Sequence, residues 1–362
     1  MTTVLAARGV CRPGPPAPGW VAIDDGVVVE TGTGAARPGP GAVDLGDALL
    51  APGFLDLQVN GIGDVDLATA DADAWARADD ALVRGGTTGY CPTFVSAPLD
   101  SYGPALARAR VARTQTDAIL GVHLEGPFLG NAPGAHPREL VRQVDVDWLE
   151  HALSTHADLI TLVTLAPEAD PGCVAVRLLA ERGVVVALGH STASYDEALA
   201  ATAAGATVVT HLFNGMGPLH HREPGLAGAA LTDDRLTPTL IADLVHVHPA
   251  GLRLAIATKR SVALVTDSVA IGDGAFTRRD GAARLPDGTL AGSTLTLDRA
   301  IANVAALGVP VERAVEMATT IPAEVLGLRD RGRLAPGTRA DLVALDPASL
   351  AVQAVWLAGE RA

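Results

Sequence analysis

Two patterns of hydrophobic positions alternate along the middle of the chain. Short runs rich in Val, Ile and Leu are typical of buried strands, and the Ala-rich segments between them have helical composition and spacing. Eight strand candidates follow one another: Phe54–Val59, Thr87–Phe94, Ile119–Glu125, Leu159–Leu165, Val184–Leu188, Val208–Leu212, Pro238–Ala242 and Val262–Thr266. The helix candidates between them include Ala72–Arg84, Leu99–Arg113, Val146–His156, Cys173–Arg182 and Ser194–Ala204. This regular alternation predicts an α/β fold, and eight units favour a closed (β/α)8 TIM-like barrel.

The two ends of the chain have a different character. Residues 1 to about 50 contain short β runs separated by Gly/Pro-rich turns, including the hairpin signal Asp24-Asp25-Gly26. The stretch from Gly332 to Trp356 looks similar, and neither end has enough apolar residues to fold alone. We therefore expect residues 1–50 and 327–362 to form a small β-sandwich together, beside a barrel domain of residues 51–326.

Composition limits the partners and the compartment. Hydrophobic residues make up 48% of the chain and aromatic residues only 3%, so the core must be built from Ala, Val and Leu. A net charge of −14 argues against nucleic acid or an anionic membrane as a partner. The three cysteines lack paired spacing, the N-terminus lacks a signal-peptide pattern, and no apolar run has the length of a membrane span. These features predict a cytoplasmic protein.

Polar residues collect where the predicted strands end. The carboxyl ends of barrel strands carry the chemistry of such enzymes. Seven of the eight candidates end in groups that can bind a metal, a proton or a sugar hydroxyl, whereas their inner portions are apolar. These groups are Gln58 and Asn60, Cys91 and Thr93, His123 and Glu125, His190, His211 and Asn214, Asp243 and His246, and Asp267. The asymmetry favours an active site at this edge.

Three of these residues have the composition of a catalytic metal site. His190 and His211 each follow a β-branched run, and the Ala-rich helix between them makes a βαβ crossover, so both lie at the same sheet edge. Glu125 ends an earlier strand. A lone histidine at a strand end is usually structural, but this set of two histidines and one carboxylate leaves room for water and predicts a divalent metal ion. His123 points to the same side of its strand as Glu125. We expect that it either supports the metal site or simply packs in the core.

Seven motifs carry a family resemblance. PGFLDLQVNG, GVHLEGPF, LGHS, THLFNGMGPLHHREPGLAG, IADLVHVHP, LVTDS and GTLAGSTLTL occur in this order. The chain resembles the N-acetylglucosamine-6-phosphate deacetylases, a family within the amidohydrolase superfamily of metal-dependent barrels. The resemblance runs almost end to end. It implies hydrolysis of N-acetyl-D-glucosamine 6-phosphate to D-glucosamine 6-phosphate and acetate, in amino-sugar catabolism, by a homodimer.

The resemblance also implies a role for individual residues. Glu125, His190 and His211 match the metal ligands, and Asp267 matches the catalytic carboxylate. Arg222 matches a phosphate-binding arginine, whose planar fork suits a phosphate. The complete set of matched substrate contacts is Ala135, His136, Asn214, Gly215, Arg222, Asp243, His246, Leu290, Ala291 and Gly292.

The chain departs from the superfamily at its first strand. Many members carry His-x-His there and hold two metals, whereas this chain has Gln58-Val59-Asn60. Gln58 and Asn60 remain possible additional site residues, and we expect one divalent ion per subunit. Zn²⁺ is our first expectation, and Fe²⁺, Co²⁺ or Mn²⁺ suit the same ligands. Leu244 stands where relatives often have glycine, which affects the expected shape of the sugar pocket.

Two other functions remain open at this point. The same scaffold can deacetylate N-acetylgalactosamine 6-phosphate or another N-acyl amino sugar, since only contacts to the 4-hydroxyl group distinguish the epimers. A non-catalytic sugar-phosphate-binding protein is a remote alternative. It predicts loss of Asp267 or of a metal ligand, and this chain retains all of them.

Overall fold

The computed structural model describes residues 2–34, 42–272, 276–279 and 281–362. The chain divides into two compact units. One consists of Met1–Asp56, Asp79–Gly89 and Thr296–Ala362, and the other of Leu57–Ala78 and Tyr90–Leu295. The sequence predicted one domain of residues 1–50 with 327–362 and another of residues 51–326. These domain boundaries follow the two large sheets rather than the compact units, and they stay a prediction.

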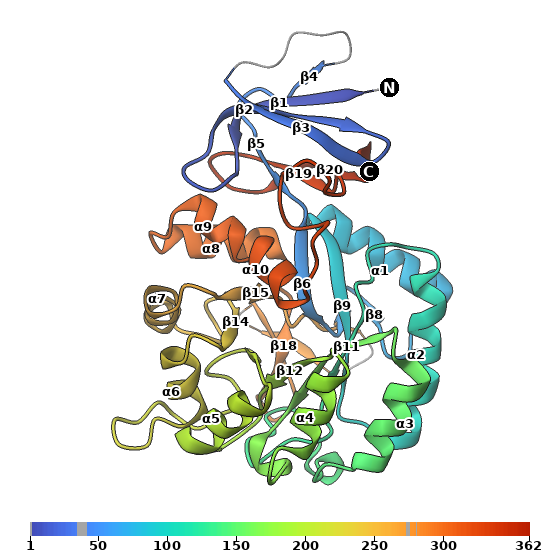
Figure 1. Ribbon diagram of the computed structural model, residues 1–362, viewed down its shortest axis with the longest axis vertical. Helices are drawn as coiled ribbons and strands as arrows, with labels where there is room; N and C mark the ends of the chain where they lie inside the picture. Colours follow the sequence, from blue (N-terminus) through green and yellow to red (C-terminus); the bar gives the residue numbers. More distant parts are fainter. Residues whose placement is uncertain (1, 35–41, 273–275, 280) are drawn as a thin grey trace. The chain divides into compact units, whose positions relative to one another are not determined.

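An eight-stranded parallel sheet forms the barrel (Figure 1). Neighbours along it are β15, β14, β13, β12, β11, β10, β9 and β6. The ring closes between its first and last strands, because Val59 bridges Ser268 and the Asp267 amide donates to the Gln58 carbonyl at 3.0 Å. The predicted α/β barrel is therefore confirmed. Its strands span Phe54–Val59 (β6), Thr87–Val95 (β9), Val122–Glu125 (β10), Ile160–Leu165 (β11), Val185–Leu188 (β12), Val208–Val209 (β13), Thr237–Ile241 (β14) and Ala263–Val265 (β15).

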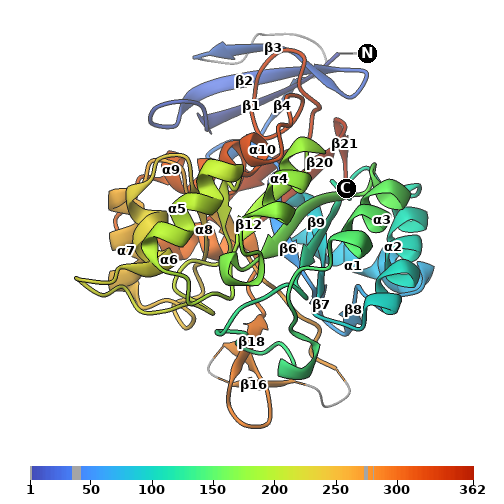
Figure 2. The same cartoon turned by 60° about the horizontal axis from the view of Figure 1, so that its bottom comes forward.

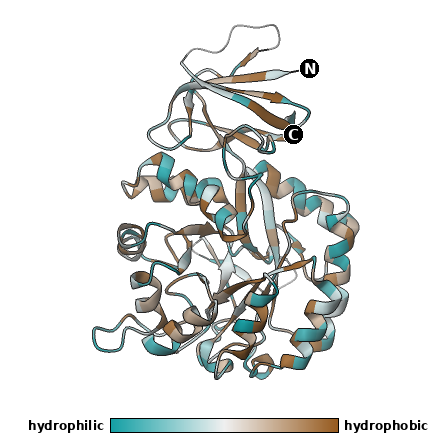
Figure 3. Cartoon of the chain, in the orientation of Figure 1, coloured by the Kyte–Doolittle hydropathy of each residue, from teal (hydrophilic) through white to brown (hydrophobic). Residues whose placement is uncertain are grey.

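Helices follow the strands and begin at side chains that cap them. Asp145 accepts the Trp148 amide at the start of α3, and Ser194 and Glu197 form a capping box at α5. Hydrophobic and hydrophilic bands alternate along α1 (Figure 3), as expected of a helix with one buried face. The helices are Ala72–Arg84 (α1), Leu99–Arg113 (α2), Val146–His156 (α3), Val174–Glu181 (α4), Tyr195–Ala204 (α5), Gly225–Thr232 (α6), Pro249–Thr258 (α7), Leu297–Ala306 (α8), Val311–Glu316 (α9) and Thr320–Val325 (α10), with 3-10 turns at Arg138–Leu140 and Pro167–Ala169.

Two strands are shorter by three residues than the apolar runs that predicted them. β10 begins only at Val122, because Gly121 before it has a φ of 145°. β13 ends at Val209, and His211, two residues later, has a φ of 30°. A positive φ cannot continue a strand, so β10 starts late, and the backbone leaves the sheet after β13 where His211 follows.

Both termini contribute to one further sheet. Its order is β21-β20-β19-β5-β1-β2-β3, with β4 paired to β1. The Asp25-Gly26 turn joins β2 and β3 with φ values of 49° and 74°, the sign that a two-residue hairpin requires. Val28 at one edge and Trp356 near the other share one core, so the sheet curls over itself. Its strands are Thr3–Val10 (β1), Ala17–Asp24 (β2), Val27–Thr33 (β3), Ala42–Asp44 (β4), Leu49–Pro52 (β5), Leu342–Leu345 (β19), Val352–Leu357 (β20) and Glu360–Arg361 (β21).

A three-stranded antiparallel sheet follows the last barrel strand (Figure 2). It contains β16 (Thr277–Arg279), β17 (Ala282–Arg284) and β18 (Leu290–Ser293). The Ser293 amide donates to the Asp267 carbonyl at 2.8 Å, which ties β18 to the end of β15. The hydrophobic pattern did not predict this sheet. A small hairpin of Gly61–Ile62 (β7) and Val65–Asp66 (β8) follows β6, and no described helix is long and apolar enough to cross a membrane.

Candidate metal centre and active-site cavity

Glu125, His190 and His211 converge at the carboxyl ends of neighbouring strands. Glu125 Oε1 lies 3.0 Å from His190 Nε2 and 2.9 Å from His211 Nε2, and the two nitrogens are 3.1 Å apart. All three residues are buried. Three electron-pair donors held this closely need a cation between them, and two imidazoles with one carboxylate suit a divalent transition metal. The predicted ligand set therefore fits such an ion.

The hydrogen bonds of His190 orient it as a ligand. Its Nδ1 lies 3.3 Å from the Ala132 carbonyl oxygen, an acceptor only. Nδ1 therefore carries the proton, and Nε2 keeps its lone pair for the cluster. A ligating histidine is usually fixed by such a bond from its other nitrogen.

The electrostatics of the cluster already favour a bound cation. Burial raises the pKa of Glu125, but hydrogen bonds and charge from His190 and His211 outweigh it and hold this pKa well below its usual range. Burial lowers the pKa of His211, but the hydrogen bond and charge of Glu125 reverse the shift and raise it. The carboxylate stays ionised and attracts positive charge. A metal ion would replace the proton that holds this cluster together.

The backbone is left-handed where the chemistry lies. His190, His211 and Asp267 have φ values of 49°, 30° and 48°. Residues other than glycine adopt this conformation at a cost of about 1–2 kcal/mol each. The surrounding fold must supply that energy, which is common where a backbone is bent to aim a side chain.

His136 lies beside the cluster in the loop after β10. One donor atom from each of Glu125, His136 and His190 lies within 4.8 Å of the others, so geometry alone permits His136 as a ligand. The Ser96 amide and hydroxyl both approach His136 Nδ1, at 3.3 and 2.9 Å. Burial, and then the charge of His190, lowers the pKa of His136 to about 3. The ring is therefore neutral with its proton on Nε2, which makes it a hydrogen-bond donor rather than a ligand.

His123 lies beneath the cluster and does not face the cavity. Its ring nitrogens contact the Leu57 carbonyl oxygen at 3.2 Å, and the hydroxyls of Thr93 and Thr164 at 3.3 and 2.7 Å. Burial lowers its pKa to about 4, so the ring is neutral. The sequence left open whether His123 supports the site or only packs in the core. These contacts favour the first alternative, in which His123 supports the strand that carries Glu125.

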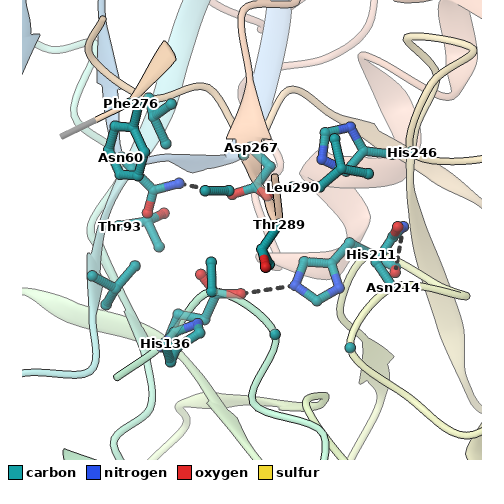
Figure 4. Close-up of a pocket in the computed structure, with 18 of the residues that line it drawn as sticks. Asn60, Thr93, His136, His211, Asn214, His246, Asp267, Phe276, Thr289 and Leu290 are labelled. Atoms are coloured by element: carbon teal, nitrogen blue, oxygen red, sulfur yellow. Dashed lines mark hydrogen bonds and ion pairs between the residues drawn. The ribbon is translucent and has the colours of Figure 1, made fainter. Parts of the chain in front are cut away.

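Asp267 is linked to the cluster through one side chain. Gln58 Nε2 donates to Glu125 Oε1 at 3.0 Å and to Asp267 Oδ1 at 3.1 Å. Asn60 Nδ2 also donates to Asp267 Oδ1, at 2.7 Å (Figure 4). Burial, and then the charge of Glu125, raises the pKa of Asp267 to about 6. Both amides bind the same oxygen, so the other carboxylate oxygen is available for a proton.

A cavity of about 610 Å³ opens over these groups. Several of its lining residues hold buried polar atoms that lack a partner within the described chain: Asn60 Oδ1, His211 Nδ1, His246 Nε2 and Arg284 Nε. Buried polar groups normally find partners, so a polar ligand is expected here. The predicted site residues that line the cavity are Asn60, Glu125, Ala135, His136, His190, His211, Asn214, Gly215, His246, Asp267, Leu290, Ala291 and Gly292.

Three predicted site residues lie outside the lining. Gln58 is buried behind Glu125 and Asp267. Asp243 Oδ2 lies 2.6 Å from His246 Nδ1, which leaves His246 Nε2 for the cavity, so Asp243 orients its neighbour. Arg222 is exposed, and its Nη1 lies 2.8 Å from His221 Nε2. Its role in binding the phosphate stays a prediction.

Leu244 also lies outside the lining. It has a φ of 67° and is 40% exposed. The conformation explains a preference for glycine at this position. The leucine is not among the described residues that line the cavity, and its effect on the shape of the sugar pocket stays a prediction.

Two predicted contact residues must be glycine for steric reasons. A Cβ on Gly215, at φ +58°, would lie 2.7 Å from His190 Nδ1. A Cβ on Gly292, at φ +79°, would lie 2.7 Å from the Asp267 carbonyl oxygen. Any side chain at either position would displace a residue of the site.

Glu168 joins two loops around the cavity. Its Oε1 accepts the Thr192 amide at 2.7 Å and the Asn131 amide at 3.3 Å, while Oε2 accepts the Ser191 hydroxyl at 2.5 Å. It thereby fixes the residues that follow His190. The only signal for Glu168 in the sequence was its place just after a predicted strand. Nothing in the sequence indicated which loop residues it would bind.

Comparison with known proteins identifies the family. A model of the amidohydrolase family matches residues 49–361. The N-acetylgalactosamine-6-phosphate deacetylase of Escherichia coli O157:H7 is 38% identical over 385 residues, with 100% of both chains covered. The N-acetylglucosamine-6-phosphate deacetylase of Bos taurus is 39% identical over 345 residues, which cover 88% of this chain and 84% of that protein.

Solved structures place the chain in the same group. One holds a variant of the N-acetyl-D-glucosamine-6-phosphate deacetylase of Mycobacterium smegmatis in complex with N-acetyl-D-glucosamine-6-phosphate. It matches with a TM-score of 0.93 at 37% identity and covers 99% of each chain. The N-acetylglucosamine-6-phosphate deacetylase of Pasteurella multocida gives a TM-score of 0.94 at 29% identity and covers 100% of each chain. The chain therefore belongs to the amidohydrolase family, and within it to the group of the N-acetylhexosamine-6-phosphate deacetylases.

Proposed function

We propose that this protein is a metal-dependent amide hydrolase. It removes the acetyl group from N-acetyl-D-glucosamine 6-phosphate and yields D-glucosamine 6-phosphate and acetate, a step of amino-sugar catabolism. The observation that carries this proposal is a buried carboxylate beside a three-donor cluster. The Gln58 amide bridges Asp267 to Glu125, at 3.1 and 3.0 Å.

One divalent ion would be held by Glu125, His190 and His211. When bound, such an ion supplies Lewis acidity, which polarises a carbonyl group and makes water a better nucleophile. Gln58 and Asn60 offer only neutral amide oxygens, which are weaker ligands for a transition metal than imidazole or carboxylate, and their amide nitrogens already donate to carboxylates. We therefore infer one ion per subunit, with Zn²⁺ as the first expectation for this donor set.

Asp267 moves the proton. Its carboxylate takes a proton from the attacking water as the oxygen bonds to the acetyl carbon. It then gives this proton to the amide nitrogen, so that the carbon–nitrogen bond breaks and the amine leaves neutral. A pKa raised to about 6 suits both roles, because a group that titrates near neutral pH can accept and release a proton readily.

His136 and His246 hold the substrate around this carboxylate. His136 offers an Nε2 proton beside the metal cluster, where the acetyl oxygen would lie. The imidazole of His246 is fixed through Nδ1 by Asp243 at 2.6 Å, and its buried Nε2 has no protein partner in the described chain. Both side chains are pre-positioned, His136 as a donor through Nε2 and His246 with Nε2 turned to the cavity, which lowers the cost of ordering the substrate.

The galactosamine epimer is the second candidate substrate. Identity to the galactosamine-type relative, 38%, is close to the 39% found for a glucosamine-type relative. Only contacts to the 4-hydroxyl group separate the two sugars. We place the glucosamine substrate first, and a cytoplasmic homodimer remains a prediction that localisation and size-exclusion measurements would check.

A substrate panel tests this function. The purified, metal-loaded protein should release acetate from N-acetylglucosamine 6-phosphate faster than from the galactosamine epimer, and faster than from unphosphorylated N-acetylglucosamine. Faster turnover of the epimer would reverse the order of the two candidates. Binding of the phosphorylated sugars without acetate release would instead point to a non-catalytic binding protein.

A further inference from the structure

We propose that Asn214 is a site of spontaneous covalent modification in the wall of the cavity. An asparagine that precedes glycine loses its side-chain amide readily, because glycine has no Cβ to keep the next backbone nitrogen away from the side chain. The chain contains four asparagines, and two of them, Asn60 and Asn214, precede glycine. Both line the cavity. The two labile pairs of the chain therefore lie beside the groups that carry the proposed activity.

The modification needs no reactant other than water. The backbone nitrogen of Gly215 loses its proton to solvent and bonds to the carboxamide carbon of Asn214. Ammonia then leaves with a proton taken up from solvent, which balances the proton lost by the backbone. Water opens the resulting five-membered succinimide at either carbonyl group. The products are aspartate and isoaspartate at position 214, and no atom is oxidised or reduced.

Close packing keeps both glycines in the sequence. A Cβ on Gly215 would lie 2.7 Å from His190 Nδ1, and a Cβ on Gly61 would lie 2.4 Å from the Val65 carbonyl oxygen. Neither glycine can gain a side chain that would protect the asparagine before it. The two pairs differ instead in how firmly their reacting groups are held.

The Asn60 pair is held at both of its reacting groups. The Gly61 amide donates to the Ser268 carbonyl oxygen at 3.0 Å, so the attacking nitrogen is engaged. The Asn60 carboxamide points toward Asp267 (Figure 4) and donates through Nδ2 to Asp267 Oδ1 at 2.7 Å. Ring closure at this pair must first break both hydrogen bonds. The Asn60 pair is therefore protected, although its sequence is labile.

The Asn214 pair lacks one of these restraints. Its carboxamide donates through Nδ2 to the carbonyl oxygens of His211 and Leu212, at 3.2 and 3.4 Å, and both bonds are long. The Gly215 amide donates no hydrogen bond to another residue of the described chain. Both residues are half-buried and line the cavity, where water can reach them. The attacking nitrogen is thus free at Asn214 and engaged at Asn60.

Modification at position 214 would change the site in two ways. Both products add a negative charge to a wall that faces an anionic substrate, which rests on the proposed function. Isoaspartate also adds one carbon to the main chain directly before Gly215. The Gly215 carbonyl oxygen accepts the Ser191 amide at 2.9 Å, so this shift would reach the residue that follows His190. The enzyme should therefore lose activity as position 214 is modified.

Peptide mapping by mass spectrometry tests the proposal on the wild-type, metal-loaded protein after incubation in warm, mildly alkaline buffer. The peptide that contains Asn214 should gain about one mass unit and separate into two forms, aspartate and isoaspartate. Asn60 should react at least about tenfold more slowly, because a hydrogen bond to a charged group must break first. Asn131 is exposed but precedes alanine, so it reports the effect of exposure alone and should also react more slowly. An unmodified Asn214 peptide, or equally fast reaction at Asn60 or Asn131, would overturn the proposal.

The variant Asn214→Gln separates modification from general loss of the enzyme. Its longer side chain would have to close a six-membered ring, so the mass gain at this position should disappear. Wild type should lose activity in step with the unmodified Asn214 peptide, whereas Asn214→Gln should keep its own starting activity longer. Equal rates of loss in the two proteins would overturn the inactivation. If the protein hydrolyses no amino sugar, the peptide map still decides the modification, because it needs no catalysis.

Discussion

Replacing Asp267 by asparagine should raise the stability of the metal-free protein and lower the activity of the metal-loaded enzyme. Asp267 is buried, with 9% of its surface exposed, and its pKa is raised from 3.8 to about 6, first by burial and then by the charge of Glu125. This difference corresponds to about 3 kcal/mol, because one pKa unit is about 1.4 kcal/mol. The ionised carboxylate therefore destabilises the metal-free protein at neutral pH.

The sign of the effect follows from proton binding. Between about pH 4 and pH 6 the folded protein binds this proton more tightly than the unfolded chain does. Stability is therefore lost as pH rises through this window. Asp267→Asn cannot ionise and keeps the oxygen that accepts the Asn60 and Gln58 amides. In metal-free protein it should gain up to about 3 kcal/mol at pH 8, and almost nothing at pH 4.

Denaturant unfolding in the presence of a chelator measures the stability, and acetate release by the metal-loaded variant measures the activity. Turnover should fall about 10²- to 10⁴-fold while metal stays bound. Asp243→Asn is the opposing control. Burial raises the pKa of Asp243, but its hydrogen bond to His246 reverses the shift and lowers it, so this variant should lose stability at neutral pH. An Asp267→Asn protein that gained no stability at pH 8, or kept its turnover, would refute the reasoning.

Three further predictions follow from the same site, and one concerns a helix cap. Elemental analysis should find about one metal per chain, and His190→Asn should lose it and recover partly on addition of excess metal; two equivalents at full activity would contradict a single site. The rate should fall as pH drops below about 6, because Asp267 must be ionised to accept a proton, and a bound cation should move this limb to lower pH. Glu168→Gln should cost about tenfold in kcat/KM or metal affinity, because it breaks one of the bonds that hold the loops after His190. Asp145→Ala, which removes the α3 cap and a surface ion pair with Arg142, should cost about 1 kcal/mol of stability with unchanged kcat.

Much of the fold was predictable from the sequence because local pattern determines it. The bounds of α1, α2 and α3 agree with the segments expected from composition and spacing. The alternation of eight apolar strands with helices predicted the barrel, since parallel strands need such crossovers and bury both faces. The same rule brought Glu125, His190 and His211 to one edge, where Nε2 and Oε1 atoms lie within 3.1 Å of one another.

Only the tertiary structure decided which loop side chains lie above the carboxyl ends of the barrel strands. No periodicity indicated that β17 would carry Arg284 to the cavity, that Arg222 would stay outside the lining, or that Asp243 would serve by orienting His246. A strand end is placed by the barrel to which it belongs, whereas a loop is placed by hydrogen bonds to other loops. Glu168 shows the difference, because its partners Asn131 and Thr192 come from separate segments that only the folded chain brings together.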